Sequence, residues 1–242
     1  MDEQTWLTTT EWLSLWQSIP WEDRLDRKRR LIATAICRQF DSLLSDHRLM
    51  RMIEMSEAVA GKRSVVWDDW ETTFRGAEIA ELDSELVANR AAARAIATPG
   101  SDDHKVGRAI EAAADVFGYL AAIRAGVMPS NASQNTTQTI WTHPVFIAGR
   151  DQEGGEVISR IIREVVINPF RPTPFADSWR TETVMSVANG MYGSRDFSAM
   201  PILADALQDA GCENEGILNH CHDGKATHVR GCWLVDLVLD KC

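Results

Sequence analysis

The stretch RLIATAICRQFDSLL, residues 30–44, decides the fold class of this chain. Its large apolar side chains recur every three or four residues: Ile32, Ile36, Phe40 and Leu43. That spacing places them on one face of an α-helix, whereas a half-buried strand would alternate apolar and polar residues. The stretch therefore predicts an amphipathic helix over residues 22–45.

The same helical spacing continues on both sides of this stretch. Helix starts and stops are marked by Asp46, Gly61 and Gly126 before the middle of the chain, and by Thr181, Pro201 and Gly211 after it. Between such signals we expect helices over 10–19, 46–61, 67–97, 103–126, 157–166, 181–191, 200–210, 214–221 and 229–240. The sequence thus predicts an all-α fold, a multi-helix globular bundle.

One long segment breaks the helical pattern. Residues 128–155 include the polar run PSNASQNTTQT (129–139) and close with two glycines, with one short apolar element expected around Trp141 to Ile147. A loop of this length is often functional or marks a boundary. We therefore expect two helical halves, 1–127 and 156–242, joined by a polar loop over 128–155, although one single domain is also compatible with the length.

Composition excludes several classes of protein. The chain has 242 residues and a net charge of −10, which argues against a nucleic-acid partner because such proteins need a basic face. No apolar stretch approaches the ~20 residues of a membrane helix, so no membrane partner is expected. The N-terminus is acidic and polar, unlike a secretory signal, and we expect a cytoplasmic protein.

Cysteine and histidine gather near the C-terminus. Cys212, His220, His228 and Cys232 offer two thiols and two imidazoles, the ligand types of a Cys2His2 zinc site. No CxxC pair supports that assignment, and zinc is the one cofactor that the residues suggest. The preferred interpretation is a structural polar cluster in which the cysteines pack in the core.

A catalytic use of the same region is a third interpretation. Cys232 or Cys221 could be activated as a nucleophile by His228 or His220. No sequence motif identifies an oxyanion hole or an orienting acid. Residues 212–232 are therefore the region where a metal-dependent or Cys–His hydrolase would have its centre.

Tryptophan is concentrated at the N-terminus. Four of the nine tryptophans fall in the first 21 residues: Trp6, Trp12, Trp16 and Trp21. Tryptophan is a common anchor at protein interfaces, so these residues are a candidate partner surface. Burial in a seam between helices is the simpler interpretation.

Two parts of the chain contain longer motifs that are similar to those of a known family. The C-terminal part contains INPFRP (167–172), MPILADALQDAGC (200–212) and HVRGCWLVDLVLDK (228–241), and the N-terminal part contains RKRRLIATAICRQFDSLLSDHR (27–48). Over about residues 11–60 and 166–241 the chain resembles an uncharacterised family of bacterial helical proteins, numerous in planctomycete-type genomes. The resemblance implies a shared helical fold and no particular reaction.

Function is therefore predicted only in outline. Whether the protein is an enzyme stays open, because the common nucleotide, protease and hydrolase motifs are absent. The leading hypothesis is a non-enzymatic interaction or adaptor module with another protein as partner and a structural Cys/His cluster. The alternatives are the hydrolase described above and a small-ligand sensor with a pocket between the two halves. The oligomeric state is not predicted.

Overall fold

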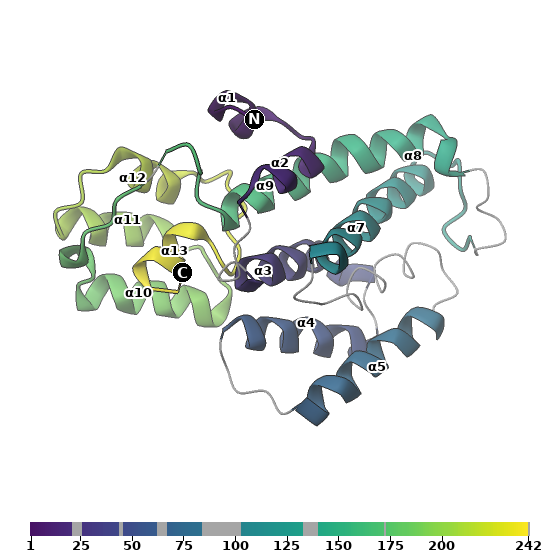
Figure 1. Ribbon diagram of the computed structural model, residues 1–242, viewed down its shortest axis with the longest axis horizontal. Coiled ribbons are helices and arrows are strands. Elements are labelled where there is room, and N and C mark those ends of the chain that lie inside the picture. The colour runs from purple at the N-terminus through teal and green to yellow at the C-terminus, as the bar shows by residue number, and fades with distance from the viewer. Residues whose placement is uncertain are drawn as a thin grey trace. The chain divides into compact units, whose positions relative to one another are not determined.

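The computed structural model describes residues 1–20, 26–43, 46–61, 67–83, 103–132, 140–171 and 173–241. Within those ranges every regular element is a helix and no β-strand occurs (Figure 1). The prediction of an all-α fold is confirmed. No helix in the described ranges is both long enough and apolar enough to span a membrane.

The chain divides into two compact units. The larger unit is Thr8–Ser159, and the smaller unit joins Met1–Leu7 to Arg160–Cys242. The division falls inside helix α9 (Gly155–Val165), and the first seven residues group with the C-terminal part. The independence of residues 1–127 and 156–242 as folded halves stays a prediction.

The larger unit is built around helix α3, which carries the first apolar stripe, and the helices that pack on it. Helix α3 packs against α4 and α7, and α4 packs against α5. Short helices α8 and η5 lie along α7. The bounds are α2 Trp12–Ser18, α3 Asp26–Cys37, η2 Arg38–Leu43, α4 His47–Ala60, α5 Trp67–Asp83, α7 Asp103–Arg124, η4 Ile140–Thr142, α8 Pro144–Ala148 and η5 Gly149–Gly154.

The stripe that predicts the first long helix is buried as expected. Ile32 and Ile36 are fully buried, and Phe40 stacks edge-on against Phe117 with ring centroids 5.1 Å apart. The helix is not continuous, however, because its last six described residues tighten into the 3₁₀ helix η2. The ends of the predicted range, 22–25 and 44–45, lie outside the described residues, as does 84–97 of the helix expected over 67–97.

The segment predicted as a loop over 128–155 is partly helical. Residues 140–155 form η4, α8, the π-helix η5 and the start of α9, while 133–139 lie outside the described residues. A cap explains the start of α8: the His143 Nδ1 atom accepts a hydrogen bond from the Val145 N–H at 3.2 Å, and Pro144 occupies the first turn. The short apolar element expected around Trp141 to Ile147 lies in η4 and α8, and the prediction missed the helical cap and the continuation through η5.

A close approach between α7 and η5 depends on glycine. A Cβ atom added at Gly149 would lie 2.4 Å from the Cβ of Ala121 and 2.8 Å from the Phe117 carbonyl oxygen. The backbone of Gly149 is ordinary right-handed helix, so the requirement is for space and not for an unusual dihedral angle. Helix η5 can lie this close to α7 only because the residue has no side chain.

We expect Gly149→Ala to lower the free energy of unfolding by about 1–3 kcal/mol, because the added methyl group overpacks this contact. Gly190→Ala is the matched control: it lies inside α10 (Glu182–Ser194) with nothing within 4 Å of an added Cβ. There alanine should stabilise by about 0.5–1 kcal/mol through helix propensity. Urea denaturation measures both changes, and equal effects of the two substitutions would contradict the close approach.

The smaller unit buries a second core between its helices. Helix α11 packs against α10 and α12, and α10 packs against α13 (Figure 1, green to yellow). The Thr181 and Asn214 side chains cap α10 and α12, and Gly211 ends α11 with φ +88°. The bounds are α1 Glu3–Thr8, α9 Gly155–Val165, η6 Asp177–Trp179, α10 Glu182–Ser194, α11 Met200–Asp209, α12 Glu215–His222 and α13 Trp233–Val238.

The last helix is shorter than expected. The sequence predicts a helix over 229–240, but α13 begins only at Trp233. Gly231 has φ +99°, which a right-handed helix does not allow, and Cys232 is the N-cap residue. The His228–Cys232 segment is therefore a turn that precedes the helix, and these two side chains are not one helical turn apart.

Candidate metal centre

Four side chains from four places along the chain converge in the smaller unit. Glu164 comes from α9, His220 from the last turn of α12, His228 from the loop that follows, and Cys232 from the N-cap of α13. One ligand atom from each side chain can be chosen so that all four lie within 4.8 Å of one another. The fold thus brings a carboxylate, two imidazoles and a thiol to a single point.

The contacts among these groups are short and involve specific atoms. The His228 Nδ1 atom lies 2.9 Å from Glu164 Oε1, and the His220 Nε2 atom lies 3.7 Å from the same oxygen. The His220 Nε2 atom is also 3.2 Å from the Cys232 sulfur. Glu164 and His220 are therefore the central members of the group.

Local structure explains why these side chains point to one place. Asn214 starts α12, so that Ile217 and Cys221 face the core and His220 lies at the edge of that buried face. The His220 ring packs against Trp233, with ring centroids 4.7 Å apart. It also meets the His228 ring edge-on at 5.0 Å. These ring contacts fix the orientation of the His220 imidazole.

Burial sets the protonation of the group. Burial lowers the pKa of His220 below its ordinary 6.5, and the nearby Glu164 carboxylate only partly opposes that shift. Burial also raises the pKa of the Cys232 thiol well above 9.0, and Glu164 raises it further by repelling a thiolate and accepting a hydrogen bond from the neutral thiol. Without a cation, the group holds a neutral thiol and a neutral His220 imidazole.

One buried atom of the group is orphaned. The Nε2 atom of His228 is buried and has no hydrogen-bond partner. A buried imidazole normally satisfies both of its ring nitrogens, because an unmade hydrogen bond costs about 1–3 kcal/mol. It is a different nitrogen from the Nδ1 atom that contacts Glu164, and the ring can offer an ion only one of the two.

The donor set and its spacing fit a zinc ion. Zinc binds Cys, His and carboxylate at about 2.0–2.3 Å in a tetrahedron, whose donor atoms are then about 3.3–3.6 Å apart. Three separations between donor atoms, 2.9, 3.7 and 3.2 Å, lie around that range, and every pair in the group is within 4.8 Å. Calcium and magnesium prefer oxygen ligands only, so the thiol and imidazoles favour zinc.

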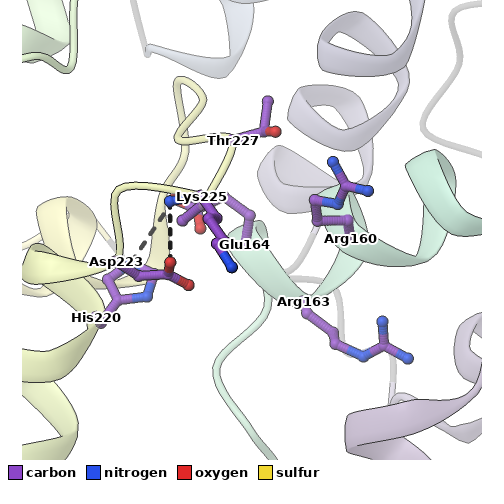
Figure 2. Close-up of a pocket in the computed structure, with 8 residues that line it drawn as sticks. Arg160, Arg163, Glu164, His220, Asp223, Lys225 and Thr227 are labelled. Atoms are coloured by element: carbon purple, nitrogen blue, oxygen red, sulfur yellow. Dashed lines mark hydrogen bonds and ion pairs between the residues drawn. The ribbon is translucent and has the colours of Figure 1, made fainter.

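A pocket adjoins the group on one side. It has a volume of about 510 Å³ and is formed by one face of α9 together with the end of α12 and the loop after it. Figure 2 shows Glu164 projecting from α9 into this space, with His220 on the opposite wall. The other lining residues are Arg160, Arg163, Asp223, Lys225, Ala226 and Thr227.

Three of the four predicted ligands belong to the group, and one does not. His220, His228 and Cys232 come together, whereas Glu164 takes the fourth place that we expected for Cys212. Cys212 packs in the apolar core of the smaller unit, 1% exposed. Cys221 is buried in the same core, and burial raises the pKa of its thiol to about 12.

Glu164 was missed because it lies 56 residues before His220 in the sequence. The sequence does contain a weak indication that Glu164 is buried. It stands three residues after the buried Ile161, so it shares a side of α9 that apolar residues bury. A charged residue at such a position needs a buried partner.

The predicted tryptophan surface is not found in the described residues. Trp6, Trp12 and Trp16 are 1%, 8% and 7% exposed, and Trp21 lies outside the described residues. Trp6 instead packs near Phe170, with ring centroids 6.5 Å apart. These three side chains are buried, and the partner surface at the N-terminal tryptophans stays a prediction.

Comparison with known proteins gives no further guide: no protein-family model, no curated protein and no solved structure matches this chain.

Proposed function

We propose that this protein is a zinc-stabilised helical module, in which one ion bound by Glu164, His220, His228 and Cys232 joins α9, α12 and α13. One observation carries the proposal: four ligand atoms of types that zinc prefers lie within 4.8 Å of one another.

Closure of the coordination shell supports a structural role for the ion. Four protein ligands complete a tetrahedron, whereas catalytic zinc sites keep one position for water or substrate. The Glu164 and Cys232 side chains are buried, and that of His228 is 8% exposed. An ion surrounded in this way stabilises the fold by linking separate segments of the chain.

The hydrolase hypothesis has less support from the same geometry. A nucleophilic cysteine needs a lowered pKa and access to substrate. Cys232 is fully buried, and burial raises the pKa of its thiol. The adaptor and sensor hypotheses stay predictions.

The test is the metal content of untagged protein after incubation with stoichiometric zinc and removal of unbound ions. We expect about one zinc ion per chain in the wild-type protein and almost none in His228→Ala, because three remaining ligands hold zinc far more weakly. His222→Ala is the matched control, since His222 is exposed on the same helix as His220 and lies outside the group.

Two results would overturn the proposal. One is wild-type protein that stays metal-free while circular dichroism shows it folded. The other is His228→Ala protein that keeps as much zinc as His222→Ala.

A further inference from the structure

His220 is the least enclosed of the four side chains in the group. Its side chain is 16% exposed, against 5% for Glu164 and 8% for His228, and Cys232 is fully buried. His220 also lines the pocket of about 510 Å³ beside the group (Figure 2). The imidazole therefore has free space on one side, into which it can rotate. The geometry of the group depends on what holds this ring in place.

The same ring is central to the group. The His220 Nε2 atom lies 3.7 Å from Glu164 Oε1 and 3.2 Å from the Cys232 sulfur. If the ring turns into the pocket, only three ligands remain, and a tetrahedral zinc site loses one corner. An ion can bind tightly only when the ring is kept out of the pocket.

Trp233 is in contact with this ring. The centroids of the indole and the imidazole are 4.7 Å apart, with an angle of 47° between the planes, a separation at which aromatic rings attract each other. Trp233 packs against the apolar core of the smaller unit and is the first residue of α13, directly after Cys232. It thus connects the His220 ring to the core and to the backbone that carries the thiol.

The second imidazole is held in another way. The His228 Nδ1 atom lies 2.9 Å from Glu164 Oε1, whereas its nearest aromatic contact in the smaller unit, with Phe197, has ring centroids 6.4 Å apart. A polar contact fixes His228, and an aromatic contact fixes His220. A substitution of Trp233 should therefore act on the site through His220.

We propose that Trp233 is a positioning residue of the metal centre, whose indole holds the His220 imidazole in the orientation that binds the ion. The inference rests on the proposed function and adds to it a residue that is not a ligand. A ring that is already oriented loses less entropy when the ion binds. Removal of an outer contact that orients a ligand typically lowers metal affinity about 10- to 100-fold.

The experiment measures zinc affinity, by competition with a chromophoric chelator, and the visible absorption spectrum of the cobalt(II)-loaded protein. Cobalt(II) replaces zinc in such sites, and its spectrum depends on the number and geometry of its ligands. We expect Trp233→Leu to weaken zinc binding about tenfold or more and to change the cobalt spectrum. Trp233→Phe keeps an aromatic ring, so its affinity should stay within about threefold of the wild type, with a wild-type spectrum.

Trp179→Leu is the matched control. Trp179 is a partly buried tryptophan that packs against the same core, edge-on to Phe175 with ring centroids 5.3 Å apart, and it lies outside the metal group. Its loss should lower Tm but leave zinc affinity and the cobalt spectrum unchanged. If Trp233→Leu does not fold, Trp233→Met takes its place with the same expected result, because methionine fills more of the space without a ring.

Three outcomes overturn this inference alone while the wild-type protein binds zinc. One is a ring-free variant of Trp233 with wild-type affinity and spectrum. Another is equal weakening by Trp179→Leu, which would indicate a general loss of stability. The third is Trp233→Phe binding as weakly as the ring-free variant. A folded wild-type protein that binds neither zinc nor cobalt overturns the proposed function and this inference with it.

Discussion

Zinc-loaded protein is expected to unfold about 10 °C above protein stripped with a chelator. A ligand that binds only the folded state stabilises it by about 4 kcal/mol at a thousandfold excess over its dissociation constant. In this protein the ion would join α9, α12 and α13, which are separate helices of the chain. Its loss leaves a buried carboxylate, imidazoles and thiol without their common partner. Differential scanning calorimetry of both forms measures the difference.

The informative quantity is the difference in Tm between the zinc-loaded and stripped forms of each variant. In Cys232→Ser that difference should fall close to zero, because a hydroxyl is a poor zinc ligand. In Cys212→Ser it should remain near the wild-type value even though the baseline Tm drops, since Cys212 is a core residue outside the group. A wild-type Tm that does not respond to chelation would contradict a stabilising ion.

The affinity for zinc is expected to rise about tenfold for each pH unit between pH 7 and pH 9. Zinc binds the thiolate, and burial together with Glu164 raises the pKa of Cys232 well above 9.0, so the metal-free protein carries a thiol proton across this range. Each bound ion must displace that proton. His220 adds none, because burial lowers its pKa below 6.5 and leaves it neutral. Affinity therefore increases with pH.

Competition with a chromophoric zinc indicator, corrected for its own protonation, gives the slope. Cys232→Asp supplies the control, since a carboxyl has an ordinary pKa of about 3.9 against about 8.5 for a thiol, and its slope should be well below that of the wild type. Cys212→Ser should keep the wild-type slope. Equal slopes in the wild-type protein and in Cys232→Asp would mean that Cys232 is not the ligand that releases the proton.

Local signals in the sequence predicted the fold class and much of the element order. The apolar spacing of Ile32, Ile36 and Phe40 indicated a buried helical face, and the structure buries all three. Asp46 and Thr181 were identified as caps, and each accepts a backbone hydrogen bond at the start of its helix. Such signals succeed because a helix depends on contacts three and four residues apart, which are visible in sequence.

Where local signals competed, the prediction of individual elements failed. Residues 140–155 were expected as loop because polar residues and glycines precede and end them, yet the cap at His143 and the close packing of Gly149 on α7 make them helical. The helix expected from 229 starts at Trp233 because Gly231 takes a positive φ.

The metal centre shows which features can be predicted from the sequence and which depend on the tertiary structure. The sequence alone indicated helices, their caps, and a C-terminal region in which His220, His228 and Cys232 were candidate ligands. It could not exclude Cys212, whose thiol is the same chemical group as that of Cys232. Only the tertiary structure buried Cys212 among apolar side chains and brought Glu164, 64 residues before His228, to 2.9 Å from its ring. The physical reason is that helix formation is governed by neighbours along the chain, whereas a coordination site is a meeting of segments that only the packing of helices places together.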